Sequence, residues 1–257
     1  MSESEFQFVR MVGFAAAAGF AFVLQRLRPY DPLYRTRQTN LVLWVIDAVV
    51  MSAACGACAC TVARWANTAH VGLLNVVNVP SWAGTLVSVP ALDFVSYAWH
   101  RANHRLPFLW RFHQVHHSDL SFTVSTALRF HPGELLLSLP IRLLAVALVG
   151  APAIAVVTFE IVFAFANLFE HGNIRLPLQF EQRLAGVIVT PALHRRHHAN
   201  QLPNLDSNFG TILCFWDRTL GTYAKSSSAL RVETGLPGND ARVLTTRQAL
   251  LLPLGRR

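Results

Sequence analysis

The sequence DFVSYAWHRANHRLPFLWRFHQVHHS, residues 93–118, contains two closely spaced histidine boxes. HRANH at 100–104 has the spacing HxxxH, HQVHH at 113–117 has the spacing HxxHH, and a second HxxHH follows as HRRHH at 194–198. On a helix, residues three and four apart are neighbours, with Cβ atoms about 5–6 Å apart. Each box therefore directs two or three imidazoles toward one point, and we expect helices that carry a metal site.

The remaining histidines show how far this clustering extends. Of the 11 histidines, all except His70 lie between His100 and His198. His131 stands alone in FRFHPGE, and His171 stands alone in FEHGN. Imidazole is a good ligand for iron, zinc and copper, and the histidines of the three boxes exceed what one ion can use. Together the boxes predict two metal ions, each with room for a substrate or oxygen.

The composition indicates a membrane protein. Hydrophobic residues make up 53% of the chain and charged residues 14%, and the mean hydropathy is +0.35. The net charge of +8 could attract nucleic acid, but in a chain this apolar arginines more often mark the cytoplasmic ends of membrane helices. We therefore expect no nucleic-acid partner. The run CGACAC at 55–60 predicts small buried side chains, because no second cysteine pair completes a tetrahedral metal site.

Apolar stretches long enough to cross a membrane, which takes about 17–25 residues, occur at 6–24, 41–63, 71–100 and 135–169. The third stretch contains Pro80 and Pro90, which predict a kink or a break. The fourth is too long for one span, and Gly-Ala-Pro at 150–152 predicts the turn of a helical hairpin.

The distribution of basic residues predicts the orientation of these spans. The loop 26–40 contains four arginines, whereas the loop 64–70 contains one, so the positive-inside rule puts 26–40 in the cytoplasm. The third stretch then returns to the cytoplasm near His100, and the hairpin leaves everything after Phe169 on that side. Three basic residues fall outside the cytoplasmic segments: Arg10, Arg64 and Arg142.

The expected fold class is all-α, a polytopic membrane helical bundle with a cytoplasm-facing, histidine-rich metal-binding cap. Residues 1–90 would form the N-terminal spans, residues 91–225 the histidine-box catalytic core with its membrane hairpin at 135–169, and residues 226–257 a cytoplasmic tail. The chain is thus expected to be an integral, multi-pass membrane protein whose active site faces the cytoplasm.

The boxes and their flanking residues resemble the fatty acid hydroxylase/sterol desaturase superfamily. The similarity covers 93–134, EHGN at 170–173, TPALHRRHHAN at 190–200 and NFGTILCFWDRTLGTY at 208–223, where Thr219-Leu220 replaces the usual Leu-Phe. The resemblance implies a helical membrane anchor and a cap that holds two iron ions. It further implies O2 as a co-substrate and two electrons from a reductase.

The resemblance also implies which residues form the site. In several relatives a fuller HxxxH box stands where this chain has only His171, so a water, Asn173 or His131 could complete the ligands of one iron. Asp93 shares a helical stripe with His100 and could accept a hydrogen bond from a bound imidazole, or serve as a buried cap or as the partner of an arginine. Zinc could replace iron on purification. The implied metal ligands are His100, His104, His113, His116, His117, His171, His194, His197 and His198, with His131 added. The expected supporting residues are Asp93, Asn173 and Asp217.

The expected activity is hydroxylation of an unactivated C–H bond of a lipid, such as a fatty acyl chain or a sterol. Such a bond has no acidic proton and no leaving group, so the cofactor must supply the chemistry. A membrane lipid desaturase with the same metal site is the alternative. A metal-binding or metal-transport membrane protein is more distant, because transport calls for ligands near the middle of the spans.

Two kinds of partner follow from these expectations. The sequence has no GxGxxG fingerprint and no cysteine-rich cluster for an iron–sulfur centre, which predicts a separate electron donor of the ferredoxin or cytochrome type with its reductase. The stretch 71–100 and the hairpin 135–169 are expected to form an apolar slot for the lipid. Arg105, Arg111 and Arg129 could receive an anionic headgroup, or could simply anchor the chain at the interface.

Overall fold

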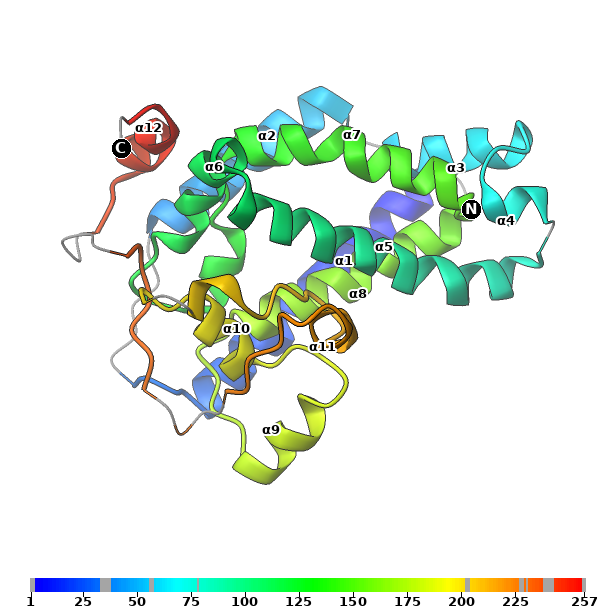
Figure 1. Ribbon diagram of the computed structural model, residues 1–257. Coiled ribbons are helices and arrows are strands. Elements are labelled where there is room, and N and C mark those ends of the chain that lie inside the picture. The colour runs from blue at the N-terminus through cyan, green and yellow to red at the C-terminus, as the bar shows by residue number, and fades with distance from the viewer. Residues whose placement is uncertain are drawn as a thin grey trace.

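The computed structural model describes residues 3–32, 38–55, 58–77, 79–201, 204–226, 229, 231–237 and 243–255. Within these residues the regular structure is helical (Figure 1), and the extended pairings are isolated β-bridges, such as the one between Pro29 and Ile174. The expected all-α class is confirmed.

Four segments among the described residues are long and apolar enough to cross a membrane: α1 (Glu3–Leu27), Gln38–Val76, α7 (Pro132–Val149) and α8 (Ala153–Glu170). The second segment comprises α2 (Gln38–Cys55), α3 (Cys58–Thr68) and α4 (Leu73–Val76). The expected hairpin is confirmed, since Gly150 ends α7 in the left-handed region, with φ 72°, and α8 begins three residues later.

The stretch 71–100 is broken as expected, because α4 ends at Val76 and Pro80 is the N-cap of the next helix. α5 (Ser81–Arg105) is one continuous helix with Pro90 inside it, and it is not one of the four apolar segments. The buried polar side chains of Ser88, Asp93 and Asn103 lower its apolar character. α5 nevertheless packs along α8 and α7, so it extends from the membrane bundle into the region of the histidines.

Small residues let α1 approach α8 closely. A Cβ at Gly13 would lie 2.8 Å from Cγ1 of Ile161, and Ala17 and Ala21 are also buried. Membrane helices commonly associate through such small residues, because the lipid supplies no hydrophobic driving force between them. Cys60 is buried in the core beside this contact, as expected for a small apolar side chain. The side chains of Cys55 and Cys58 lie outside the part that the structure describes.

The shorter helices form a cap at one end of the bundle. They are α6 (Pro107–His117), η1 (Val124–Leu128), α9 (Leu178–Leu184), α10 (Pro191–His197), η2 (Asn204–Asp206), α11 (Phe215–Thr219), α12 (Thr246–Leu251) and η3 (Leu252–Leu254). Proline at the first position starts α6 and α10, and the Thr190 hydroxyl caps α10 by accepting a hydrogen bond from Leu193 N. Figure 1 places α6, α10 and α12 at the end of the bundle opposite α4.

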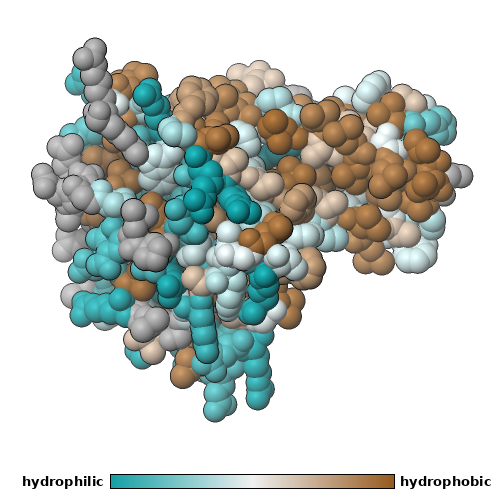
Figure 2. Space-filling view, in the orientation of Figure 1, coloured by the Kyte–Doolittle hydropathy of each residue, from teal (hydrophilic) through white to brown (hydrophobic). Residues whose placement is uncertain are grey.

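The molecular surface divides in the same way. Figure 2 shows hydrophobic residues over the end of the bundle where α3 and α4 lie, and hydrophilic residues over the cap. The segment near the C-terminus belongs to the cap end as well, because Ala249 of α12 is buried against Leu43 of α2 and Val115 of α6. The cap thus lies at one end of the apolar bundle rather than within it.

Candidate metal centre

Nine of the expected histidines come together in two groups at the cap end of the bundle. Within each group the potential ligand atoms all lie within 4.8 Å of one another. Every member is buried except His104, which is partly exposed. The first group is His100, His104, His113, His117 and His197, and the second group is His116, His171, His194 and His198.

Helical spacing explains how adjacent histidines serve different groups. His113 and His117 of α6 are four residues apart and belong to the first group. His116 lies about 100° around the helix axis from His117 and belongs to the second group. α10 divides its own box in the same manner, with His197 in the first group and the two remaining histidines of the box in the second.

Hydrogen bonds at Nδ1 orient five of the imidazoles. Nδ1 of His113 lies 2.9 Å from Oε1 of Glu134. The other four lie 2.7–3.2 Å from backbone carbonyl oxygens: His100 with Phe209, His116 with Arg129, His171 with Asn167 and His197 with Ser207. Because a carbonyl oxygen only accepts, Nδ1 carries the hydrogen and Nε2 keeps its lone pair. Metal-binding histidines are typically held in this way.

The second group contains a contact that neutral imidazoles alone would not favour. Nε2 of His171 lies 3.0 Å from Nε2 of His116 and 2.9 Å from Nε2 of His194. His116 and His171 both donate from Nδ1, so their Nε2 lone pairs face each other. Burial lowers the pKa of His171 to about 3, so protonation does not relieve this repulsion near neutral pH. A cation shared by these nitrogens would relieve the repulsion. Two ligand nitrogens about 2.1 Å from one metal ion and at right angles lie about 3 Å apart, which matches the observed contacts.

The first group is defined by buried nitrogen atoms without partners. Burial lowers the pKa of His197 to about 3, so its imidazole is neutral near pH 7. A buried polar atom without a hydrogen bond costs about 1–3 kcal/mol, and such atoms are rare. In the described part of the chain, the Nε2 atoms without a hydrogen bond include those of His100, His104, His113, His117 and His197. Their convergence on one point fits a metal ion.

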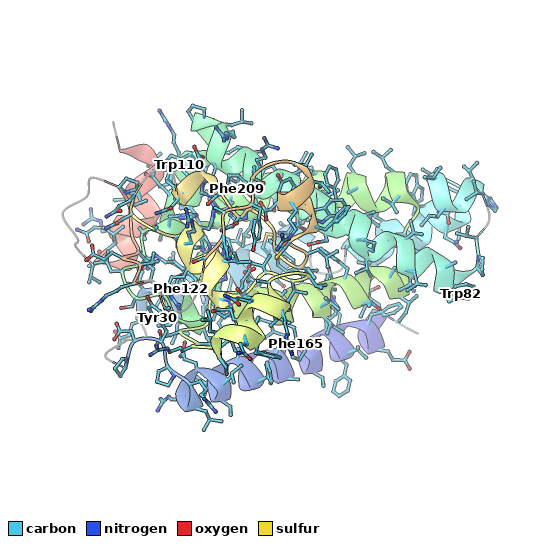
Figure 3. The ribbon with its side chains drawn as sticks, turned by 60° about the horizontal axis from the view of Figure 1, so that its bottom comes forward. Tyr30, Trp82, Trp110, Phe122, Phe165 and Phe209 are labelled. Carbon is cyan, nitrogen blue, oxygen red and sulfur yellow. The ribbon has the colours of Figure 1, made fainter. Side chains whose placement is uncertain are left out.

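Aromatic side chains surround both groups. Trp110 and Phe209 lie beside the first group, with ring centroids 5.0–6.1 Å from its imidazoles. Phe122 and Phe130 lie beside the second, and the Phe130 ring stacks on His116 at 4.6 Å. Figure 3 shows Trp110, Phe122 and Phe209 at one end of the molecule and Trp82 at the other. These rings shield the histidines from water.

His131 does not belong to either group, which corrects the expectation that it is a ligand. Its Nδ1 accepts a hydrogen bond from Gly133 N at 2.9 Å and caps α7. Its Nε2 lies 3.2 Å from the carbonyl oxygen of Leu250 and donates to it. Both ring nitrogens are therefore engaged in holding α7 and α12.

Asn173 also lies outside both groups. Its side chain donates to the carbonyl of Asp31 at 2.7 Å and accepts from Asp31 N at 3.0 Å. Its own backbone N–H donates to the side chain of Gln25. Asn173 thus holds the chain that follows α1, and it does not fill the place of a ligand in the second group.

Asp93 and Asp217 bind the 209–216 loop rather than an imidazole. Asp93 accepts four hydrogen bonds, including one from the Trp216 indole at 2.8 Å. Asp217 accepts from Phe209 N and Gly210 N, each at 2.8 Å. Because the Phe209 carbonyl accepts from His100, Asp217 supports that ligand through the backbone, whereas Asp93 makes no direct bond to a histidine.

The three arginines expected to receive a headgroup do not line the cavity described below. Arg129 is buried and donates to Val115, Ser118 and Asn40, so it fixes the loop after α6 to α2. Arg105 is exposed and lies 3.8 Å from Asp206. Arg111 is exposed on α6. The headgroup role therefore finds no support for this set.

The structure adds two carboxylates that sequence reasoning missed. Glu134 follows HPG in the quoted FRFHPGE segment, and it holds both His113 and Asn103 through Oε1. Glu170 precedes His171, and its Oε1 lies 3.8 Å from Nδ1 of His171 and from Nε2 of His194. Neither oxygen of Glu170 has a hydrogen-bond partner among the described residues. Its signal in the sequence was a carboxylate directly before a lone histidine at the end of the hairpin.

An apolar cavity of about 740 Å³ opens onto both groups. α1, α2, α5, α7 and α8 contribute to its wall, and His100, His113, His116, His171 and His194 line one end of it. Leu92, Leu139, Val156 and Phe159 are among the apolar residues along it. The expected slot between the third stretch and the hairpin is thus present, and it also includes parts of α1 and α2.

Curated relatives with related sequences are named for oxygenases. Ornithine lipid hydroxylase OlsE of Rhizobium tropici is 32% identical over 58% of this chain and 44% of its own length. Alkylglycerol monooxygenase of Homo sapiens is 30% identical over 56% of this chain and 30% of its own, and cholesterol 25-hydroxylase of Rattus norvegicus is 26% identical over 58% and 50%.

The similarity to these relatives covers only part of their length. The chain spans half or less of the length of each of them, and no solved structure gives a significant match. Residues 85–222, which include every histidine of the two groups, match the fatty acid hydroxylase family. This match covers more than half of the chain, and the protein belongs to the fatty acid hydroxylase family.

Proposed function

We propose that this protein is a membrane-bound, O2-dependent lipid hydroxylase that holds two iron ions, one in each histidine group. The observation that carries the proposal is the meeting of both groups at one end of an apolar cavity of about 740 Å³. Ligand pockets typically enclose about 300–1,000 Å³, and apolar walls suit a lipid chain. The names of two relatives, an ornithine lipid hydroxylase and a cholesterol 25-hydroxylase, support a lipid substrate.

The nine histidines of the two groups would hold the metals through nitrogen. The first group offers five imidazoles and the second four, and Glu170, which has no hydrogen bond among the described residues, is placed to complete the second set. Imidazole and carboxylate together suit iron, although zinc could occupy the same donors on purification. His131 and Asn173 are not included in this proposal, because their polar atoms are engaged elsewhere.

When bound, the iron ions would supply the activation of O2 that no side chain can provide. The chain's own residues position the substrate and keep water out. His113, His116 and His194 line the end of the cavity, so a C–H bond that enters from the membrane side reaches the space beside both groups. Phe122 and Phe209 shield the histidines on other sides.

The reaction would need two electrons from a separate donor. We propose an acidic protein of the ferredoxin or cytochrome type with its reductase, because the segments at the cap end are rich in arginine. The same asymmetry of basic residues supports a multi-pass arrangement with the cap in the cytoplasm. Turnover of the purified chain with NAD(P)H and no added protein would overturn the need for a donor.

The test is a lipid mass profile of cells grown under 18O2 that express the wild type or His197→Ala. A lipid that gains one labelled oxygen only with the wild type is the expected result, and it identifies the substrate. A lipid that loses two hydrogens without gaining label would replace hydroxylation by desaturation. Metal analysis of the purified chain accompanies the profile, and a chain that binds no iron when iron is supplied would contradict the proposal.

A further inference from the structure

Three charged side chains lie along the cavity at a distance from the histidines. Arg10 of α1, Arg142 of α7 and Glu160 of α8 all line it. Glu160 precedes Glu170 by ten residues on α8, and Arg142 follows Glu134 by eight on α7. At about 1.5 Å per residue, both helices place these charges about 12–15 Å from the carboxylates at the histidine end. Two independent helices therefore place the charges at similar depths in the cavity.

At this depth the cavity wall carries more positive than negative charge. Arg10 and Glu160 form a two-pronged pair, with Nε to Oε2 at 2.6 Å and Nη2 to Oε1 at 2.7 Å. Nη1 of Arg10 is buried and has no hydrogen-bond partner among the described residues. Arg142 makes no hydrogen bond or ion pair within the described chain, and its guanidinium lies 5.8 Å from the centroid of the Phe163 ring. At this depth of the cavity two guanidiniums thus share the Glu160 carboxylate, while Glu134 and Glu170 lie at the histidine end.

Charged side chains inside membrane segments are costly, and those that face a cavity commonly mark the path of a ligand. A guanidinium is the cation best suited to a carboxylate or a phosphate, because its N–H groups form a planar fork. Arg10 and Arg142 are also two of the three basic residues that the positive-inside rule leaves outside the cytoplasmic segments. Anchoring at the cytoplasmic interface therefore does not explain them.

We propose that Arg142 and Nη1 of Arg10 bind the anionic group of a single-chain lipid, a carboxylate or a phosphate, while its hydrocarbon chain extends toward the histidines. Glu160 is a positioning residue that fixes the Arg10 guanidinium. The inference rests on the proposed function, because it takes the histidine end as the reacting end. It makes the hydroxylation remote: the attacked carbon lies about 12–15 Å from the anionic group.

The test measures equilibrium binding to the purified full chain in nanodiscs, with metal content determined in each sample. The probes are palmitate, hexadecyl phosphate and hexadecanol, which have the same chain length and differ in the polar group. The wild type should bind at least one anion about tenfold or more tighter than hexadecanol, as a charge-assisted pair requires, and the tighter anion identifies the group. Equal affinity for all three probes would overturn the proposal, and this comparison needs no variant.

Variants then assign the effect to the cavity arginines. Arg142→Gln should abolish the preference for the anion without changing hexadecanol binding, and Arg142→Lys should keep part of it. The matched control is Arg111→Gln, which changes an exposed arginine of α6 that does not line this cavity. The control should retain the full preference. An equal loss of binding for all three probes in Arg142→Gln would make Arg142 merely structural and overturn the assignment.

The site of oxygen insertion separates this inference from the proposed function. Under 18O2, the label should lie on a carbon remote from the anionic group, and label on the carbon next to that group would overturn the orientation. Selective anion binding without oxygen incorporation would leave the binding site standing and contradict the hydroxylase. Hydroxylation without a preference for the anion would support the hydroxylase and overturn the anion site.

Discussion

The two histidine groups are built from the same kind of box, but they are not equivalent. In the first, α5 and α6 each supply a pair of histidines four residues apart, and α10 adds one. In the second, α10 and the residue after its end supply such a pair, α6 adds one, and only His171 comes from the end of α8. The difference arises in the elements that carry no HxxHH box, since α5 contributes two ligands and α8 contributes one.

This difference indicates which group needs a carboxylate as an additional metal ligand. Glu170 lies directly before His171, buried and without a hydrogen bond among the described residues, at the place where the second group has fewer imidazoles. Glu134 lies at the first group, but it binds Nδ1 of His113 and so acts on a ligand rather than as one. The same side-chain type is therefore expected to have different roles at the two groups.

The largest effect is expected from removing an imidazole of the first group. His104→Ala should reduce turnover to background, because His104 has a buried, unpartnered Nε2 within that group. The matched control is His131→Ala, which should keep both metals and lose the cap of α7 and the hydrogen bond to Leu250, each worth about 1 kcal/mol. Loss of metal from His131→Ala, measured by elemental analysis, would restore His131 as a ligand.

A smaller effect is expected from the carboxylate that holds His113. Glu134→Ala should weaken metal binding at the first group about 10- to 100-fold, because it removes the acceptor that orients the ring. Glu134→Gln keeps an acceptor oxygen and should recover part of the affinity. Competition with a chelator measures both variants, and identical behaviour of Ala and Gln would show that the hydrogen bond is unimportant.

Glu170→Gln tests the difference between the two groups, because it should weaken metal binding at the second group alone. We expect easier loss of one ion, with the first group unchanged, because only the second group lies within reach of this carboxylate. Chelator titration followed by Mössbauer spectroscopy of 57Fe-loaded protein distinguishes the two ions. Equal loss of both ions, or no loss, would contradict a direct role for Glu170 in the second group.

The smallest effect is expected from Asp217→Asn. The change replaces one of the carboxylate oxygens that bind Phe209 N and Gly210 N, which should cost about 1–3 kcal/mol of folding stability. Asp206→Asn is the control, because among the described residues Asp206 makes only a long, exposed contact with Arg105. Thermal unfolding in detergent measures both, and equal melting temperatures would show that Asp217 does not hold the loop.

Short-range patterns predicted much of this molecule. The helical spacing of the three boxes brings eight of the nine grouped histidines together, and Gly150 ends the first helix of the hairpin as expected. In each case the information lies within a few residues, because helix geometry and turn conformation are local.

Long-range partners limited the remaining predictions. His131 is engaged by Leu250, and Arg129 is engaged by Asn40, which lies 89 positions earlier in the chain. Spacing contains no information about such contacts. The basic residues outside the cytoplasmic segments were visible in the sequence, but only the structure places Arg10 and Arg142 along one cavity.

The central claim, two unequal metal sites in one chain, is tested most directly by counting metal. Iron plus zinc per chain should be two in the wild type and one in both His104→Ala and His194→Ala, which remove an imidazole from the first and the second group, respectively. A wild type that holds a single ion when iron is in excess, or variants that still hold two, would contradict the account.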